Sequence, residues 1–264
     1  ITKGSDRSWI NEYLNDYSKG DTQDNLDYLY GEIFEYFPEL PKHKYTLREV
    51  PEVYAENFSP AAYLAYHVDS FDSNLIITNP SSDDDTLGPT LAHEGYPGHM
   101  YQSIYTRSIT DHPYMYLNTP SGYAEGWAFY VELFSTDLFD LTEKDRNAYY
   151  IDAMLNVVFM GRIDVGVNYE GWDAQDAADY MNEKFGMDLY SADAFQEIVD
   201  ICVVDPGYPL PYALGYYNTN KIISGIIVDN PDMDLVDVFE LYLGAQTGRF
   251  EQIEASVERQ LDED

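Results

Sequence analysis

Apolar residues recur every three or four positions in the N-terminal part of the chain, between Asp6 and Tyr36. This spacing places them on one face of a helix. The positions are Trp9, Ile10, Tyr13, Leu14 and Tyr17, followed by Leu26, Leu29, Tyr30, Ile33 and Phe34. Because Gly20 interrupts the pattern and Pro38 ends it, the segment predicts two helices.

The pattern changes between Tyr45 and Pro80 to short extended runs. Three of these, Tyr45–Val50, Ala62–His67 and Leu75–Thr78, are rich in β-branched or aromatic residues and are bounded by proline, aspartate, serine and asparagine. Such runs are typical of short strands. We therefore expect a small β-sheet in this part of the chain.

Helical spacing returns from Leu87 and dominates the rest of the chain. Helix-start residues stand at Ser121, Thr142, Asp173 and Ser191, where a short polar side chain can accept hydrogen bonds from the first free backbone amides. The predicted fold class is thus mainly α with a small β-sheet, an α+β protein.

The size and charge of the chain restrict the classes of function. Its 264 residues include 14 lysines and arginines against 48 acids, a formal net charge of −34, which repels nucleic acids and anionic membranes. Hydrophobic residues make up 45% of the chain, enough for a large packed core. We expect a folded protein with no nucleic-acid partner.

Cysteine usage and the length of the apolar runs exclude two further classes. Cys202 is the single cysteine, so neither a disulfide framework nor a cysteine-based zinc site is possible. No apolar run approaches the about 20 residues that a membrane-spanning helix needs. We therefore expect no membrane span in this chain.

The stretch from His93 to His99 carries the clearest chemical signal. A His-Glu pair, here His93 and Glu94, followed by a second histidine is the outline of a zinc-peptidase helix, in which the imidazoles bind the ion and the glutamate polarises water. The usual spacing between the histidines is four, but here it is six, which on a regular helix would leave the imidazoles about 120° apart. The Gly-Tyr-Pro-Gly run at Gly95–Gly98 therefore predicts a break or bulge that brings them together.

A third zinc ligand is expected from another element, because catalytic zinc sites take three protein ligands. Glu125 is the candidate, since it lies at the start of an otherwise apolar helix, where an unpaired carboxylate is costly. Glu132 follows seven residues later on the same face and could orient a ligand. A histidine by itself is more often a simple hydrogen-bonding group, but His93, Glu94, His99 and Glu125 together favour a metal.

The sequence resembles the bacterial family called domain of unknown function 885, which is grouped with the gluzincin-type zinc peptidases. The resemblance covers roughly residues 50–223 and rests on the motifs Thr90–Gln102, Glu125–Tyr130, Arg162–Gly166 with Gly171 and Trp172, and Pro206–Gly215. It departs from many members at Met100 and Asn168, where they carry histidine. The first departure favours His99 as the ligand.

This resemblance implies a zincin-like metallopeptidase fold and two parts. Residues 1–44 would be an N-terminal helical segment, the remnant of a larger N-terminal region, and residues 45–264 the zincin-like catalytic domain. Members are much longer, so the chain would be a C-terminal portion. The edge strand of the sheet, expected at Leu75–Asn79, could hold an extended peptide.

Two cleft residues are also implied by the resemblance. Tyr212 could donate a hydrogen bond to the oxyanion of a tetrahedral intermediate. Arg162 could bind a substrate carboxylate, or it could pair with Asp164 or another of the many acids. Both alternatives for Arg162 remain open at the level of sequence.

The function expected from these residues is zinc-dependent hydrolysis of peptide bonds by a metal-bound water, with Glu94 as the general base. Two alternatives stay open: a catalytically degenerate zincin that acts as a binding module, and a zinc amidohydrolase that acts on a non-peptide or cell-wall amide. We expect an extracellular or cell-surface bacterial protein, with any targeting signal upstream of Ile1.

Overall fold

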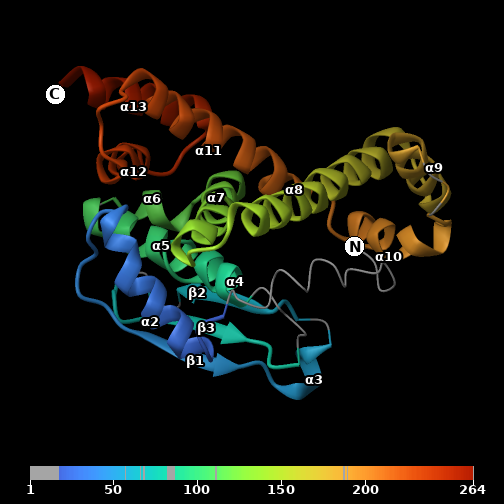
Figure 1. Cartoon of the computed structure of the whole chain (residues 1–264), viewed down its shortest axis with the longest axis horizontal. Coiled ribbons are helices and arrows are strands. Elements are labelled where there is room, and N and C mark those ends of the chain that lie inside the picture. Colours follow the sequence, from blue (N-terminus) through green and yellow to red (C-terminus); the bar gives the residue numbers. More distant parts are fainter. Residues whose placement is uncertain are drawn as a thin grey trace.

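The computed structural model describes residues 18–56, 58–65, 67, 69–81, 87–110, 112–186, 188 and 190–263 (Figure 1). The helix predicted from Trp9 to Tyr17 lies outside these residues. The described chain is mainly α-helical with one small sheet, which confirms the predicted fold class at that level.

Most of the chain folds into helices of between one and six turns. They are α2 (Thr22–Glu32), α3 (Glu52–Ala55), α4 (Leu87–Glu94), α5 (His99–Ile109), α6 (Pro113–Leu117), α7 (Ser121–Leu138), α8 (Glu143–Val165), α9 (Ala174–Phe185), α10 (Ala192–Val204), α11 (Leu210–Asp229), α12 (Leu235–Gly244) and α13 (Phe250–Glu263). A short 3-10 turn at Ile33–Glu35 follows α2, and a π-helical turn at Gly166–Glu170 follows α8.

The predicted helix starts agree with the observed ones. Thr142 caps α8 through its side-chain oxygen, and Asp173 caps α9 in a reciprocal capping box. Ser191 is the N-cap of α10, and Ser121 is the first residue of α7. Side-chain capping therefore sets the starts of α8 and α9, whereas α7 and α10 begin at the predicted places without a side-chain cap hydrogen bond.

The sheet has three strands, β1 (Tyr45–Glu49), β2 (Ala61–Ala65) and β3 (Asn74–Thr78), in the order β1-β3-β2. The β1 strand runs parallel to β3, and β2 runs antiparallel to it. The expectation of an edge strand at Leu75–Asn79 was therefore wrong, because this segment is β3, the central strand. The strand that borders the helices carrying the His-Glu motif is β2, which contacts both α4 and α5.

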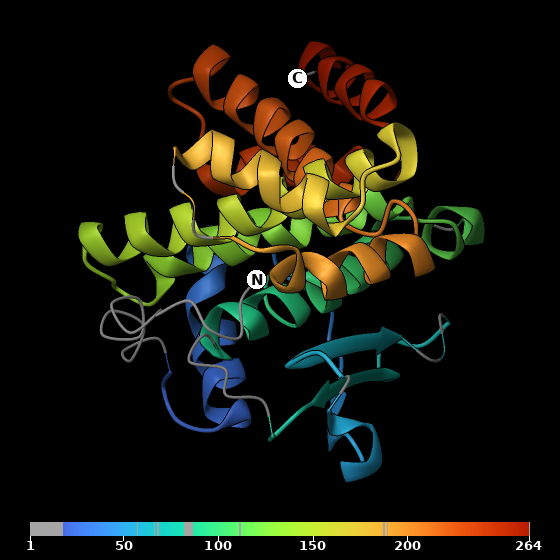
Figure 2. The same ribbon diagram turned by 90° about the vertical axis from the view of Figure 1, so that its right-hand side faces the viewer.

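The helices are stacked on the sheet in layers. In two perpendicular views the sheet forms the lower layer, α4, α5 and α7 lie above it, and α11, α12 and α13 lie furthest from it (Figures 1 and 2). The main core is aromatic and centres on Trp127 of α7, which is fully buried and packs against Phe37, Phe239 and Tyr242. Residues 18–44 contribute to the same core through Leu26 of α2 and its neighbours.

A second, smaller core joins the end of α8 to α9 and α10. It contains Ile163, Phe195 and the free, buried Cys202. In Figure 1 this unit projects to one side of the layered body, and α8 is the helix that reaches it.

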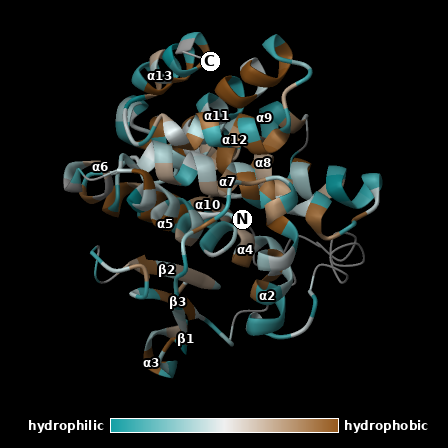
Figure 3. Ribbon diagram, turned by 90° about the vertical axis from the view of Figure 1, so that its left-hand side faces the viewer, coloured by the Kyte–Doolittle hydropathy of each residue, from teal (hydrophilic) through white to brown (hydrophobic). Residues whose placement is uncertain are grey.

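The polar faces of the outer helices are exposed. In α13, Ile253 and Val257 are buried while Glu251 and Glu258 are exposed, and the alternation of hydrophobic and hydrophilic residues along this helix is visible in Figure 3. Among the helices that the structure describes, none has the length and apolar character needed to cross a membrane.

Candidate metal centre

The His-Glu motif is divided between two helices. The α4 helix ends at Glu94, the residues Gly95–Gly98 form a turn, and α5 begins at His99. The turn contains a cis peptide bond between Tyr96 and Pro97, and the Gly98 amide donates to the Ala92 carbonyl over 2.8 Å. The predicted interruption of the helix at Gly95–Gly98 is confirmed.

Glycine is required where this turn closes on α4. A Cβ atom built on Gly98 would stand 1.7 Å from the His93 carbonyl oxygen, a contact that no side chain tolerates. From the other side, the Trp127 indole N–H donates to the Pro97 carbonyl over 2.9 Å. Because Trp127 lies on α7, the helix that carries Glu125 also fixes the turn between the two histidines.

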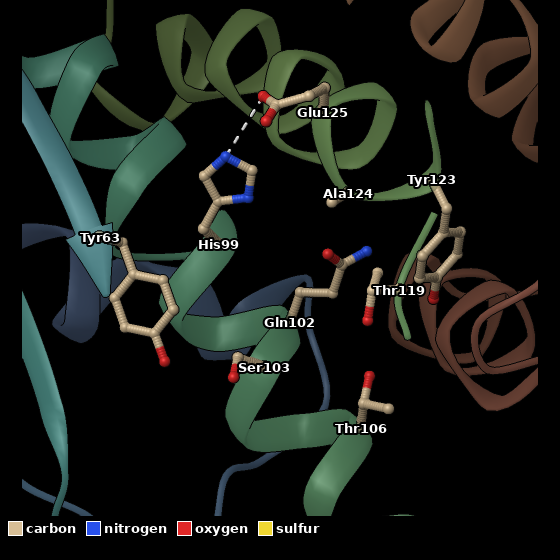
Figure 4. A pocket seen from close by; sticks show the side chains of 9 residues that line it. All are labelled: Tyr63, His99, Gln102, Ser103, Thr106, Thr119, Tyr123, Ala124 and Glu125. Carbon is tan, nitrogen blue, oxygen red and sulfur yellow. Dashed lines mark ion pairs between the residues drawn. The ribbon is translucent and has the colours of Figure 1, made fainter. Parts of the chain in front are cut away.

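Three side chains converge at the point where α4, α5 and α7 meet. The Oε2 atom of Glu125 lies 3.4 Å from His93 Nε2 and 3.3 Å from His99 Nε2, and Figure 4 shows the His99–Glu125 pair. One ligand atom from each of the three residues lies within 4.8 Å of the others. The three ligands expected from the sequence are therefore together in the structure.

These residues fit a zinc ion. Two atoms that bind one zinc ion at about 2.0–2.1 Å with tetrahedral angles are separated by about 3.3 Å, which matches both contacts of Glu125. The Glu125 Oε2 atom is buried, and among the described residues it has no hydrogen-bond partner. A buried carboxylate oxygen between two imidazole nitrogens is a suitable position for a cation.

The charges of the three groups are strongly coupled. Burial alone would lower the pKa of His93, but the Glu125 and Glu132 carboxylates together raise it well above its ordinary value. Burial alone would raise the pKa of Glu125, but His93 and His99 lower it well below its ordinary value. The metal-free cluster thus holds an ionised Glu125 carboxylate beside His93 in its doubly protonated, positively charged form.

Glu132 lies behind His93, on the side away from Glu125. Its Oε2 atom accepts a hydrogen bond from His93 Nδ1 over 2.8 Å, and its Oε1 atom accepts from the Tyr149 hydroxyl over 2.6 Å. Because Nδ1 is engaged with a carboxylate, Nε2 is the nitrogen left to face the cluster. Glu132 thus lies beside His93, the candidate ligand that it would orient.

The Glu94 carboxylate lies between the three converging side chains and the sheet, and one of its oxygens is bound to β2. Its Oε2 atom accepts a hydrogen bond from the backbone amide of Tyr63 over 2.8 Å. Tyr63 lies on β2, an edge strand. The carboxylate of Glu94 is thus held next to the cluster by the adjacent edge of the sheet.

Tyr212 of α11 lies on another side of the cluster. Its ring is 6.2 Å from the His93 ring, centroid to centroid, with an angle of 20° between the planes. Burial raises the pKa of Tyr212 far above its ordinary value, and the nearby Glu125 carboxylate raises it further. The hydroxyl therefore remains protonated.

Arg162 is engaged elsewhere. Its Nη2 atom lies 3.0 Å from Glu170 Oε2, and its guanidinium carbon stands 4.1 Å from the centroid of the Trp172 ring. Asp164, one pairing partner considered from the sequence, accepts hydrogen bonds from Asn168 and from the Gly207 amide instead. The structure thus brings six of the seven candidate residues to one place, and Arg162 pairs with an acid beside the second core.

Three features of the site were missed in the sequence. The amide of Tyr63 comes from β2 and the hydroxyl of Tyr149 from the first half of α8, and no local sequence pattern marks either group. The indole N–H of Trp127 could have been suspected, because Trp127 follows Glu125 in the same motif. Each of these groups holds a candidate residue or the turn between the histidines.

Comparison with known proteins identifies the fold and the family. No curated protein matches the sequence. A crystal structure from Colwellia psychrerythraea matches with a TM-score of 0.74 and 18% identity, over 98% of this chain and 43% of that one. A structure from Shewanella oneidensis matches with a TM-score of 0.72 and 17% identity, over 100% of this chain and 50% of that one.

Both matching proteins carry the name "putative lipoprotein", the second with the words "of unknown function". This chain therefore has the fold of about half of each of these longer proteins. The family model described as "Bacterial protein of unknown function (DUF885)" matches residues 11–224. Because the match covers most of the sequence, the chain belongs to the DUF885 family.

Proposed function

We propose that this chain is a zinc-dependent peptidase of the gluzincin type, with a zincin-like catalytic fold. The observation that carries the proposal is the convergence of His93, His99 and Glu125 around the buried Oε2 atom of Glu125, which makes no well-formed hydrogen bond with the described residues. The position of Glu94 directly after the first ligand supports a hydrolytic role, because a general base has to stand beside the metal and not on it.

A bound zinc ion would be held by His93, His99 and Glu125 and would supply Lewis acidity, which polarises a carbonyl group and lowers the pKa of water to about 7. Glu94 would accept the proton of the attacking water and deliver it to the leaving amine. The Tyr63 amide supports this role, since it fixes one oxygen of Glu94 and leaves the other available.

The Tyr212 hydroxyl would donate a hydrogen bond to the oxyanion of the tetrahedral intermediate. The nearly parallel placement of the Tyr212 ring beside the His93 ring supports this role. Its raised pKa also supports it, because only the protonated hydroxyl can donate. Arg162 would bind a substrate carboxylate only if that carboxylate displaced Glu170 from the guanidinium group.

The remaining proposals concern the whole protein. The matched structures are about twice as long as this chain, which supports the view that the chain is the catalytic portion of a longer protein, with residues 45–264 as the catalytic domain. Their name supports a cell-surface or extracellular location.

The test is a zinc titration of the metal-free protein. Hydrolysis of a mixed peptide library, followed by mass spectrometry, is expected to appear with the first equivalent of zinc and to disappear with a chelator. Muropeptides assayed in parallel separate a peptidase from a cell-wall amidohydrolase. Zinc binding at one equivalent without cleavage of any substrate would instead identify a binding module.

A further inference from the structure

A cavity of about 280 Å³ opens beside the candidate metal centre (Figure 4). His99 and Glu125 form part of its wall, so one end of the cavity lies at the cluster. The other lining residues are Tyr63, Gln102, Ser103, Thr106, Thr119, Tyr123 and Ala124. A group bound in this cavity would therefore be next to the reacting bond.

The polar wall arises from the sequence of α5. His99, Gln102, Ser103 and Thr106 are spaced by three, four and seven residues from His99, which places them on one face of the helix. The apolar residues of α5 occupy the opposite face, where they are buried in the main core: Met100, Tyr101, Ile104 and Tyr105. The helix is therefore amphipathic, with its apolar face in the main core and its polar face along the cavity.

The wall beyond the two metal ligands has hydrogen-bonding groups but no charge. Six of the seven remaining residues carry a hydroxyl or an amide, and Ala124 is the exception. The side chains of Gln102, Thr106 and Thr119 lie close together in Figure 4, with Tyr123 beside them. A wall of this kind suits an uncharged ligand that can both donate and accept hydrogen bonds.

Two of these groups are buried without a well-formed hydrogen bond. The Nε2 atom of Gln102 and the hydroxyl of Tyr123 are buried, and neither makes a well-formed hydrogen bond with the described residues. The two side chains are only 5% and 1% exposed. Because unpartnered buried polar groups are rare and costly, they point to a ligand that pairs with them.

We propose that this cavity binds the substrate side chain next to the scissile bond and selects an uncharged, hydrogen-bonding side chain, above all the carboxamide of glutamine or asparagine. This inference rests on the proposed peptidase function and adds the substrate class. A carboxamide offers an acceptor to the Gln102 amide and donors to the hydroxyl oxygens of Thr106 and Thr119. An aliphatic side chain of the same size leaves all of them unpaired.

The test compares two peptide substrates that are identical except for one residue next to the scissile bond, which is glutamine in one and methionine in the other. The comparison is made first with this residue on one side of the bond and then with it on the other. The unaltered protein is expected to prefer glutamine by about 100-fold or more in kcat/KM. Gln102→Met and Thr106→Val each remove hydrogen-bonding groups at nearly constant volume. Each is expected to reduce this preference by about tenfold or more.

The ratio of two substrates measured on one preparation does not depend on how much of the variant is folded. Thr136→Val is the matched control, because Thr136 is as buried as Thr106, at 5% exposure, and its hydroxyl donates to Leu133 within α7. This variant is expected to keep the full preference. Binding of the same peptides to zinc-loaded Glu94→Gln protein, followed by fluorescence anisotropy, should show the same order without turnover.

The outcomes separate this inference from the proposed function. Zinc-dependent cleavage with equal rates for the two peptides, or with a preference that Gln102→Met and Thr106→Val leave unchanged, would overturn the inference and leave the peptidase function intact. If no peptide is cleaved at any zinc concentration, the proposed function is wrong, and the inference that rests on it is overturned as well.

Discussion

Gly126 of α7 and Gly215 of α11 touch through their backbones. A Cβ atom built on Gly126 would lie 2.4 Å from the carbonyl carbon of Gly215, and one built on Gly215 would lie 2.4 Å from the carbonyl oxygen of Gly122. The two helices can approach this closely only because both positions are glycine. The contact lies one residue from Glu125 and three from Tyr212, so it sets how the two side chains face each other.

Gly215→Ala should therefore destabilise the protein. We expect a loss of about 1–3 kcal/mol from overpacking, larger than the gain of up to about 1 kcal/mol in helix propensity. Gly225→Ala in the same helix is the control, because a Cβ there meets nothing within 4 Å. Chemical denaturation of both variants measures the effect. Equal free energies of unfolding for the two variants would show that α7 and α11 can move apart with little loss of stability.

The proposed metal ligands can be tested singly, beginning with His99. His99→Ala should reduce the zinc content of the native protein from one per chain to well below one, because two ligands from one site seldom retain the ion. His112→Ala, at an exposed histidine before α6, should leave the zinc content unchanged. Native mass spectrometry measures both. Full zinc occupancy in the His99→Ala variant would exclude His99 from the site.

The Glu132 carboxylate should tune zinc affinity without binding the ion. Glu132→Ala removes the acceptor for His93 Nδ1 and is expected to weaken zinc binding by about 10–100-fold. Tyr149→Phe removes only the hydroxyl that supports Glu132 and should have a smaller effect in the same direction. Asp137→Asn, at an exposed acid of the same helix, is the control in a competition assay with a chelator. Unchanged affinity in the Glu132→Ala variant would contradict the positioning role.

The sequence allowed the site to be predicted where local chemistry decides the structure. The six-residue spacing of His93 and His99 requires a broken helix, and Gly95–Gly98 supplies it. Glu125 could be recognised because a carboxylate in an apolar helix needs a partner, and Glu132 because seven residues make two helical turns. Each of these arguments depends on residues close together in sequence.

Other features depend on contacts between distant segments and could not be predicted in this way. The position of β3 at the centre of the sheet follows from its pairing with both β1 and β2, and a strand pattern alone does not give that order. Arg162 has many acids within reach in so acidic a chain, so its pairing with Glu170 had no distinguishing signal. The cavity beside α5 is formed by residues of β2, α5, α7 and the connection before α7.

Zinc affinity should depend on pH through His93. The folded, metal-free protein holds the pKa of His93 well above its ordinary value, whereas zinc binds only the neutral imidazole. Below that raised pKa a proton has to leave when zinc binds, so the apparent affinity should fall by about tenfold for each unit that the pH decreases. Glu125 contributes no proton at neutral pH, because its pKa is lowered.

Calorimetry in buffers of different ionisation enthalpy measures this proton directly. About one proton should be released to the buffer for each zinc ion bound near neutral pH. Glu132→Ala should reduce the number released, because it removes one of the three carboxylates that raise the pKa of His93. Zinc binding with no proton release at neutral pH would show that His93 is already neutral in the metal-free protein.

The proposed general base can be separated from the proposed metal ligands by Glu94→Gln. The glutamine Oε1 atom can still accept the hydrogen bond from the Tyr63 amide, and Glu94 is not one of the three converging ligands, so the fold and the zinc content should be retained. Turnover should fall by about 10²–10⁴-fold, the usual contribution of a positioned general base. Glu197→Gln, at an exposed acid of α10, controls for the loss of one negative charge. If Glu94 only orients His93, the variant would bind zinc less tightly but show normal turnover per bound zinc ion. Zinc affinity and turnover should therefore be measured on one preparation.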